Sequence, residues 1–144
     1  GIPNNLFPFL TQVAIGKQKF LKVFGNNWDT DDGSGIRDYI HIIDLAEGHL
    51  ASIDYLNSQR SCIEFINLGS GNGYSVFEII KQFEISTGCK IPFSITSRRD
   101  GDVAMCYADI SKAKKLLGWT PKRSLEQICI DGWNWQLNNP KGYR

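Results

Sequence analysis

The arginines beside polar turns are the first side chains whose chemistry suggests a site. Arg37 follows a polar loop over residues 26–35, and Arg99 lies in the turn over residues 98–102, Arg-Arg-Asp-Gly-Asp. A guanidinium group matches phosphate oxygens bidentately, so two arginines from separate segments could clamp a diphosphate. A single exposed arginine is more often a solvated surface charge. The clustering in the second segment favours an anion site.

A second candidate is the glycine-rich segment over residues 69–73, which follows an apolar run and precedes a helical pattern. A phosphate-binding turn occupies this position in dinucleotide-binding folds. Its fingerprint is G-x-G-x-x-G, and the final position holds Tyr74 when counted from Gly69 and Val76 when counted from Gly71. The segment is therefore predicted to be a tight turn before a capped helix. An anion near that helix remains the alternative.

Residue type and spacing exclude several other kinds of site. His41 and His49 are eight residues apart, too far for a pair of metal ligands on one helix. His41 is expected to be a buried, hydrogen-bonded histidine. The cysteines form no C-x-x-C pair, and no serine lies in a G-x-S-x-G motif. The sequence therefore predicts neither a metal site nor a hydrolase nucleophile.

Bulk composition restricts the partners. The formal net charge of +1 provides no electrostatic footprint for nucleic acid. No apolar run approaches the roughly 20 residues that cross a bilayer, so no membrane partner is expected. Four cysteines scattered singly are typical of free thiols in a reducing compartment, which predicts a cytoplasmic location.

Hydrophobic periodicity and capping residues predict the elements that must position these groups. Strands are expected over residues 21–24, 62–68 and 91–96, with a strand end at 37–41. Helices are expected over residues 5–15, 44–56, 76–87, 110–117 and 124–136. This alternation predicts an α/β fold, or α+β for the chain in isolation. Reasoning from the residues alone ends at a soluble domain with a candidate anion site.

Several segments together resemble one family. They cover residues 1–6, 23–26, 35–41, 44–49, 67–71, 98–102, 117–119, 133–136 and 139–140. Their order and spacing are similar to those of the UDP-glucose/UDP-galactose 4-epimerases, which belong to the extended short-chain dehydrogenase/reductase family. The resemblance implies that this chain anchors the UDP part of UDP-glucose and UDP-galactose in the galactose-metabolism reaction.

The resemblance assigns roles to the polar candidates. It implies that Arg37 and Arg99 bind the diphosphate and that Asp102 accepts hydrogen bonds from the ribose hydroxyls. Tyr39 would support the nucleotide pocket. These roles agree with the residue types, because two guanidinium forks suit two phosphates and a carboxylate suits a diol.

The resemblance also implies contacts from two apolar segments. Asn5 and Leu6 would lie against the nucleotide-sugar. Lys22, Val23 and Phe24 would present backbone groups to the edge of the uracil base.

Cys106 occupies a position where some family members carry tyrosine and others cysteine. The smaller residue leaves more space beside the sugar. We therefore hypothesise that UDP-GlcNAc and UDP-GalNAc are accepted along with the unmodified sugars; the alternative is that neighbouring side chains refill the space.

Family catalysis needs parts that these residues do not contain. The implied reaction is an NAD-dependent inversion at sugar C4, which uses a dinucleotide fingerprint, a Tyr-x-x-x-Lys pair and a nearby Ser or Thr. No tyrosine here is followed four positions later by lysine. Residues 1–144 are therefore expected to be the C-terminal UDP-sugar-binding domain, without the N-terminal NAD-binding Rossmann domain. The isolated chain is expected to be inactive, because the base and cofactor would lie before Gly1.

The same resemblance bears on assembly. The unit over about residues 62–87, a strand followed by a helix, would complete the missing Rossmann sheet. In isolation, the edge from Glu64 to Leu68 would be unpaired, so self-association through it is expected. The homodimer of the parent enzyme would depend largely on the missing part.

Two other functions remain open. A dehydratase or decarboxylase acting on nucleotide-sugars could use the same fold. A non-catalytic UDP-sugar-binding module or truncated product could carry the same binding residues.

Overall fold

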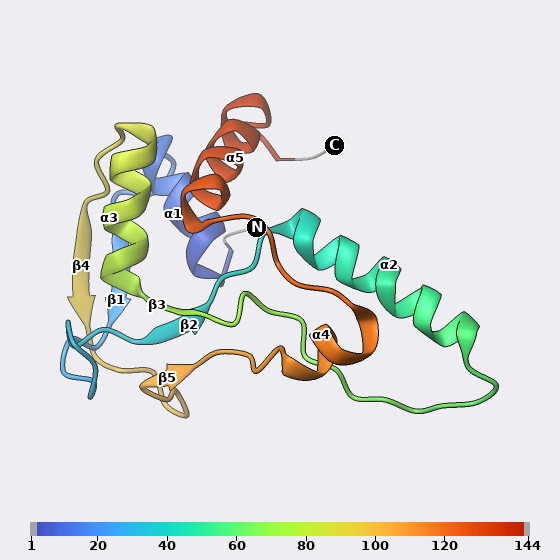
Figure 1. The fold of residues 1–144 in the computed structure, drawn as a ribbon. Helices are drawn as coiled ribbons and strands as arrows, with labels where there is room; N and C mark the ends of the chain where they lie inside the picture. The colour runs from blue at the N-terminus through green and yellow to red at the C-terminus, as the bar shows by residue number, and fades with distance from the viewer. Residues whose placement is uncertain (1–2, 143–144) are drawn as a thin grey trace.

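The computed structural model describes residues 3–142, in which five helices and five short strands alternate (Figure 1). The helices are α1 (Leu6–Ala14), α2 (Ile42–Ser58), α3 (Val76–Thr87), α4 (Ser111–Leu117) and α5 (Leu125–Asn138). The strands are β1 (Leu21–Phe24), β2 (Ile36–Asp38), β3 (Gly73–Ser75), β4 (Phe93–Thr96) and β5 (Met105–Cys106). The predicted mixed α/β class is confirmed.

The core lies where α1, α3 and α5 pack against β1. Apolar residues recur at helical spacing on α3, so Ile79, Ile80 and Phe83 all face inward. Phe83 packs edge-to-face against Phe7 and Trp133, with ring centroids 6.1 and 5.9 Å apart. The other buried members of the core are Leu10, Val13, Leu21, Val23, Ile91, Leu125 and Cys129.

The strands form two separate small sheets. One pairs β1 with β4 in parallel, so Val23 lies opposite Ile95. The other has the order β3-β2-β5, with β2 antiparallel to β3 and parallel to β5. The central strand β2 is thus bounded on both sides, and its residues set the positions of their neighbours.

The capping signals at both ends of α3 and at the start of α5 are confirmed, whereas α1 and α4 begin without a side-chain cap. Ser75 and Glu78 form a capping box at the start of α3, in which each side chain accepts from the other residue's backbone N–H. Gly88 ends α3 at φ +72°, a conformation that glycine adopts without steric cost. Ser124 accepts from the backbone N–H of Gln127 and so caps α5.

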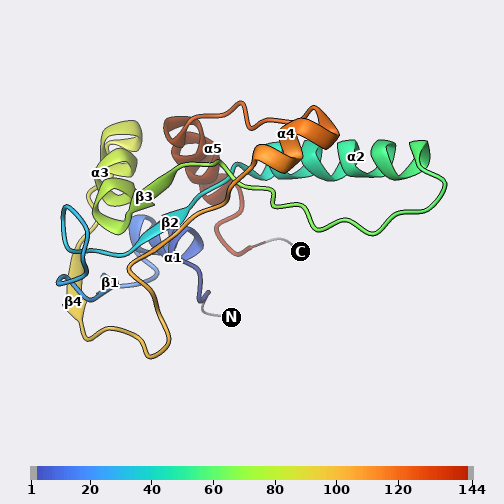
Figure 2. The same cartoon turned by 60° about the horizontal axis from the view of Figure 1, so that its bottom comes forward.

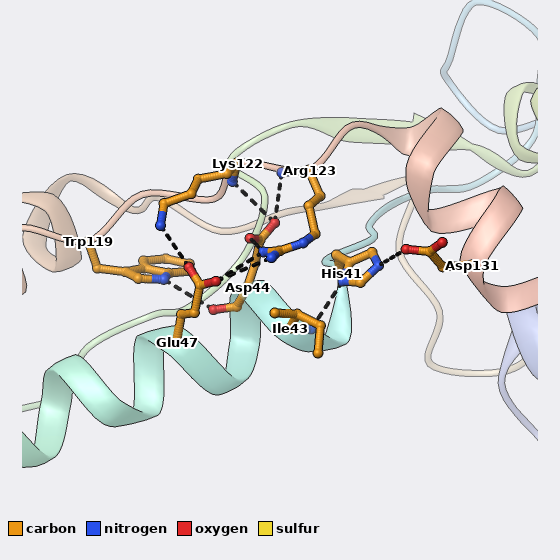
Figure 3. A network of polar contacts seen from close by, with 8 residues as sticks. All are labelled: His41, Ile43, Asp44, Glu47, Trp119, Lys122, Arg123 and Asp131. Atoms are coloured by element: carbon orange, nitrogen blue, oxygen red, sulfur yellow. Dashed lines mark hydrogen bonds and ion pairs between the residues drawn. The ribbon is translucent and has the colours of Figure 1, made fainter. Parts of the chain in front are cut away.

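Helix α2 extends away from the α1, α3 and α5 group, with α4 beside it (Figures 1 and 2). Asp44, fully buried, accepts from the guanidinium of Arg123 at 2.5 Å and from the backbone N–H groups of Lys122 and Arg123 (Figure 3). Trp119 donates to the Asp44 carbonyl at 3.1 Å. These contacts fix the connection between α4 and α5 against α2.

His41 is buried and fully hydrogen-bonded, as expected. Its Nδ1 accepts from the backbone N–H of Ile43 and so caps α2. The helix begins at Ile42, two residues before its predicted start at residue 44. Because Nδ1 is an acceptor, Nε2 carries the proton of the neutral ring and donates to Asp131 at 3.0 Å (Figure 3).

The predicted strand over residues 62–68 is wrong. This segment has no regular structure, and the side chains of Ile63 and Phe65 are each 86% exposed. Glu64 instead forms an ion pair with Lys112 of α4 at 2.8 Å. A strand buried on both faces needs neighbouring strands, and residues 3–142 supply none beside this segment. The helical half of the predicted unit over 62–87 is present as α3.

Candidate functional site

The sheet β3-β2-β5 places Arg37 between two residues of neighbouring strands. Arg37 lies opposite Tyr74 on β3 and opposite Cys106 on β5. Directly paired residues point to the same face of a sheet, so these three side chains share one face. Cys106 is exposed, and its strand is only two residues long.

Two of the predicted site residues, Arg37 and Asp102, contact each other directly. The Arg37 Nη2 atom donates to Asp102 Oδ1 at 2.9 Å, and Nη1 donates to the Ile36 carbonyl at 2.7 Å. Both side chains are about one third exposed. The pair is therefore accessible to an incoming ligand, and Asp102 Oδ2 makes no other hydrogen bond among the described residues.

Arg99 lies in the same turn as Asp102, whose backbone N–H donates to the Arg99 carbonyl. The Arg99 guanidinium stacks on the Phe24 ring, 3.8 Å from its centroid. The 99–102 turn thus contacts the end of β1 through Arg99 and contacts β2 through Asp102. Arg99 and Asp102 therefore lie in one turn that contacts both sheets, and Asp102 connects this turn to Arg37 of β2.

Strand β1 carries Lys22, Val23 and Phe24, which are expected to contact the uracil base. Lys22 is exposed, whereas the side chain of Val23 is buried in the core, so only the backbone of Val23 is available to a ligand. Within residues 3–142, β1 has one strand neighbour, β4, and its other edge has no ladder partner. The carbonyl of Phe24 already accepts from the Trp28 indole at 3.0 Å.

Asn5 and Leu6 lie at the start of α1. Asn5 is exposed and its side chain makes no cap bond, while Leu6 packs against the core. No hydrogen bond or ion pair in the described part of the chain joins either residue to the arginines. These two predicted residues therefore lie on or next to α1, an element other than those that carry Arg37 and Arg99.

Tyr39 follows β2 and packs against the core. Burial raises the pKa of its phenol to about 12, and the positive charge of Arg37 offsets this only in part. The hydroxyl is consequently neutral across the physiological range and can donate a hydrogen bond.

Asp38 is a polar residue of this region that sequence reasoning missed. Its carboxylate accepts from the backbone N–H groups of Ser70 at 2.7 Å, Gly71 at 3.3 Å and Ala108 at 3.1 Å. A Cβ atom at Gly69 would overlap Asp38 Oδ2 and would lie 2.6 Å from the Ala108 Cβ.

The glycine segment is therefore a turn around a carboxylate, as the tight-turn interpretation predicts. Two of its N–H groups are already bonded to Asp38, so they cannot cradle a phosphate. Together with the missing fingerprint, this occupancy means that the segment does not fit a dinucleotide.

Two further expectations concern a metal site and a membrane-spanning segment. No group of three or more His, Cys, Asp or Glu residues with the geometry of a metal site occurs in residues 3–142. Over the same residues, no helix has the length and apolar character needed to span a membrane.

Comparison with known proteins supports the resemblance. A family model described as GDP-mannose 4,6 dehydratase matches residues 1–131. UDP-glucose 4-epimerase from Homo sapiens is 51% identical over 143 residues, and that from Bacillus subtilis is 52% identical over 145 residues. These matches cover 99% and 100% of this chain and 41% and 42% of the relatives. The chain thus spans about two fifths of their length.

Solved structures match equally well. A UDP-glucose 4-epimerase from Stenotrophomonas maltophila, with bound NAD and formylated UDP-arabinopyranose, superposes with a TM-score of 0.94 at 45% identity. One from Bifidobacterium longum, in complex with NAD+ and UDP, gives 0.94 at 48% identity. They cover 98% and 99% of this chain, which corresponds to 42% of each structure. The chain therefore belongs to the GDP-mannose 4,6 dehydratase family, and its similarity to UDP-glucose 4-epimerases extends along its whole length.

Proposed function

We propose that residues 1–144 are the UDP-sugar-binding part of a UDP-glucose 4-epimerase that interconverts UDP-glucose and UDP-galactose. The observation that carries this proposal is the 99–102 turn between β4 and β5, whose Asp102 pairs with Arg37 of β2 and whose Arg99 stacks on Phe24 of β1. It is supported by the 51–52% identity to UDP-glucose 4-epimerases.

In this proposal the diphosphate lies between the two arginines. Arg37 already has its guanidinium oriented by the Ile36 carbonyl, which lowers the ordering cost of binding. The ribose diol donates to Asp102 Oδ2, while Oδ1 stays with Arg37. The open edge of β1 meets the uracil base through the backbone of Lys22, Val23 and Phe24, with Tyr39 beneath the nucleotide. Asn5 and Leu6 would reach the nucleotide-sugar from the start of α1.

Binding through UDP, and not through the sugar, suits a reaction that inverts the sugar. If the sugar must present both faces to the reacting groups, the enzyme cannot hold it tightly, so the binding energy should come from the non-reacting UDP. NAD, present in the two epimerase structures above, would be bound outside residues 1–144, because the Gly69 segment does not fit it. The chain by itself would then be inactive.

Cys106 is proposed to leave room for an N-acetyl group, so that UDP-GlcNAc and UDP-GalNAc are also substrates. Its exposure on the face that carries Arg37 supports this. A UDP-Glc/GlcNAc 4-epimerase from Campylobacter jejuni, 36% identical with a TM-score of 0.82, illustrates such a specificity in a related structure.

The alternative within enzymes is a dehydratase, favoured by the description of the matching family model. The higher identity to epimerases argues against it. A non-catalytic UDP-sugar-binding module would share the site but not the reaction.

A chimera tests the proposed anchor. Residues 1–144 would replace the matching 42% of the Bacillus subtilis epimerase, a region that aligns with 100% of this chain. Interconversion of UDP-galactose and UDP-glucose supports the proposal, and a folded, NAD-loaded chimera without this activity contradicts it. Because the Bacillus subtilis part supplies the catalytic residues, the dehydratase is tested by nucleotide preference instead, and tighter binding of GDP than of UDP by the 144-residue chain favours it. Calorimetry with UDP on the 144-residue chain tests the anchor alone.

Assembly follows from the exposed apolar residues. Alongside Ile63 and Phe65, helix α2 exposes Ile42, Leu50, Ile53 and Leu56, opposite the face that packs on α4. In a longer protein we propose that the NAD-binding region covers this surface and supplies most of the homodimer contact. Without it, the chain should self-associate through residues 64–68. The four free cysteines are compatible with the proposed cytoplasmic location.

A further inference from the structure

We infer that Asp38 is a positioning residue, which sets the placement of Arg37 and Cys106 by holding both neighbours of β2. The inference deepens the proposed UDP site and rests on it. Asp38 does not itself reach the Arg37 face, because successive residues of a strand point to opposite faces. Its effect on a ligand must therefore act through the residues that it fixes.

The carboxylate bridges the sheet at the end of its central strand. On the β3 side it accepts from Ser70 and Gly71, which precede β3 in the chain. On the β5 side it accepts from Ala108, two residues beyond Cys106. One side chain thus joins three segments that are separated by 32 to 70 positions.

Strand β5 depends on this contact because little else holds it. Its ladder with β2 comprises two residue pairs, Ile36 with Met105 and Arg37 with Cys106. Met105 and Cys106 are exposed, so burial contributes little to their position. The bonds from Ile36 N–H to the Ala104 carbonyl at 2.8 Å and from Ala108 N–H to Asp38 at 3.1 Å enclose the strand at both ends.

Asparagine at position 38 disturbs this arrangement without changing its size. The present carboxylate accepts three N–H groups, whereas an amide offers one oxygen and directs its NH₂ group at the remaining donors. At least one backbone N–H then loses its partner. The β5 end should move away, and Arg37 should lose its fixed distance to Cys106.

The test compares UDP with uridine by calorimetry on the 144-residue chain. Uridine lacks the diphosphate, so Arg37 has no phosphate to bind and affects uridine only through Asp102. Asp38→Asn should weaken UDP binding about three- to tenfold, less than the loss of a whole charge-assisted bond because Arg37 is displaced and not removed, and should change uridine binding less than twofold. Asp31→Asn, an exposed aspartate of the 26–35 loop, is the matched control and should change neither.

A double-mutant cycle tests whether Asp38 acts through Arg37. In an Arg37→Ala background, Asp38→Asn should add little further loss of UDP affinity. Asp38→Ser, which keeps one small acceptor, replaces the asparagine variant if that variant melts below the assay temperature. Absence of UDP binding by the unsubstituted chain would overturn the proposed function and this inference with it. UDP binding that Asp38→Asn or Asp38→Ser weakens equally with uridine binding, or not at all, overturns the positioning role alone.

Discussion

Replacement of Arg99 by alanine, alone and together with Phe24→Leu, tests the anchor most directly. In the structure the guanidinium rests on the Phe24 ring, 3.8 Å from its centroid. We expect the diphosphate to draw the guanidinium off that ring, so that phosphate binding competes with the stacking contact. The two substitutions should therefore change UDP affinity in opposite directions.

The magnitudes follow from the two interactions. A hydrogen bond to a charged group contributes about 1.5–3 kcal/mol. An exposed cation–π contact contributes about 0.5–1 kcal/mol, which Arg99 gives up on binding. The difference centres on about 1.5 kcal/mol, so Arg99→Ala should weaken UDP binding roughly tenfold. Phe24→Leu removes the competing contact and should strengthen it about two- to fivefold.

Calorimetry with UDP and uridine measures both effects. Neither substitution should alter uridine affinity by more than about twofold, because uridine has no phosphate for Arg99 to bind. In the Arg99→Ala background, Phe24→Leu should no longer strengthen UDP binding, since no guanidinium remains to be released. The reasoning is refuted if Phe24→Leu strengthens UDP binding equally with and without Arg99, or if Arg99→Ala weakens uridine and UDP alike.

Three further outcomes are expected. Asp44→Asn should lower the free energy of unfolding by about 3 kcal/mol in urea denaturation, because it breaks a buried ion pair, and Glu47→Gln should have a smaller effect. Burial raises the pKa of Asp44, but hydrogen bonds from the Arg123 backbone and side chain outweigh it and hold that pKa below 3.8. A carboxyl group whose pKa is lowered by folding stabilises the fold at pH values above its pKa in the unfolded chain. The difference in free energy of unfolding between Asp44→Asn and the unsubstituted chain should therefore shrink as the pH falls below 3.8. Phe65→Glu should reduce self-association in sedimentation velocity, whereas Ile85→Glu, on the exposed face of α3, should not; equal behaviour of the two would contradict the role of residues 64–68. Cys106→Tyr in the chimera should reduce turnover of UDP-GalNAc more than that of UDP-galactose, and equal N-acetyl turnover in both forms would show that Cys106 does not set the specificity.

The sequence predicts features whose causes lie within a few residues. Ser75 with Glu78 and the glycine at position 88 specify the two ends of α3 locally, and both are found. The prediction of a strand over residues 62–68 is wrong because its cause is not local. An apolar run can be buried in a sheet only when other strands lie beside it, and that condition is not encoded in the run itself.

The site, too, has residues that could be predicted from the sequence and residues that could not. Arginine and aspartate types, with the resemblance, indicated Arg37, Arg99 and Asp102. In the structure Arg99 and Asp102 share one turn, and Asp102 pairs with Arg37 of β2. Asp38 could not be identified, because its partners Ser70 and Ala108 lie 32 and 70 positions away. The stacking of Arg99 on Phe24 was also unforeseen, since it joins a turn to a distant strand.

The two small sheets are not hydrogen-bonded to each other, and this separation affects the thermodynamics of recognition. A nucleotide spanning from β1 to β2 would contact both sheets at once. Ordering of the ligand and of the side chains that meet it is an entropic penalty, so binding should be more favourable in enthalpy than in free energy. Occupancy should also slow amide hydrogen exchange in both sheets together.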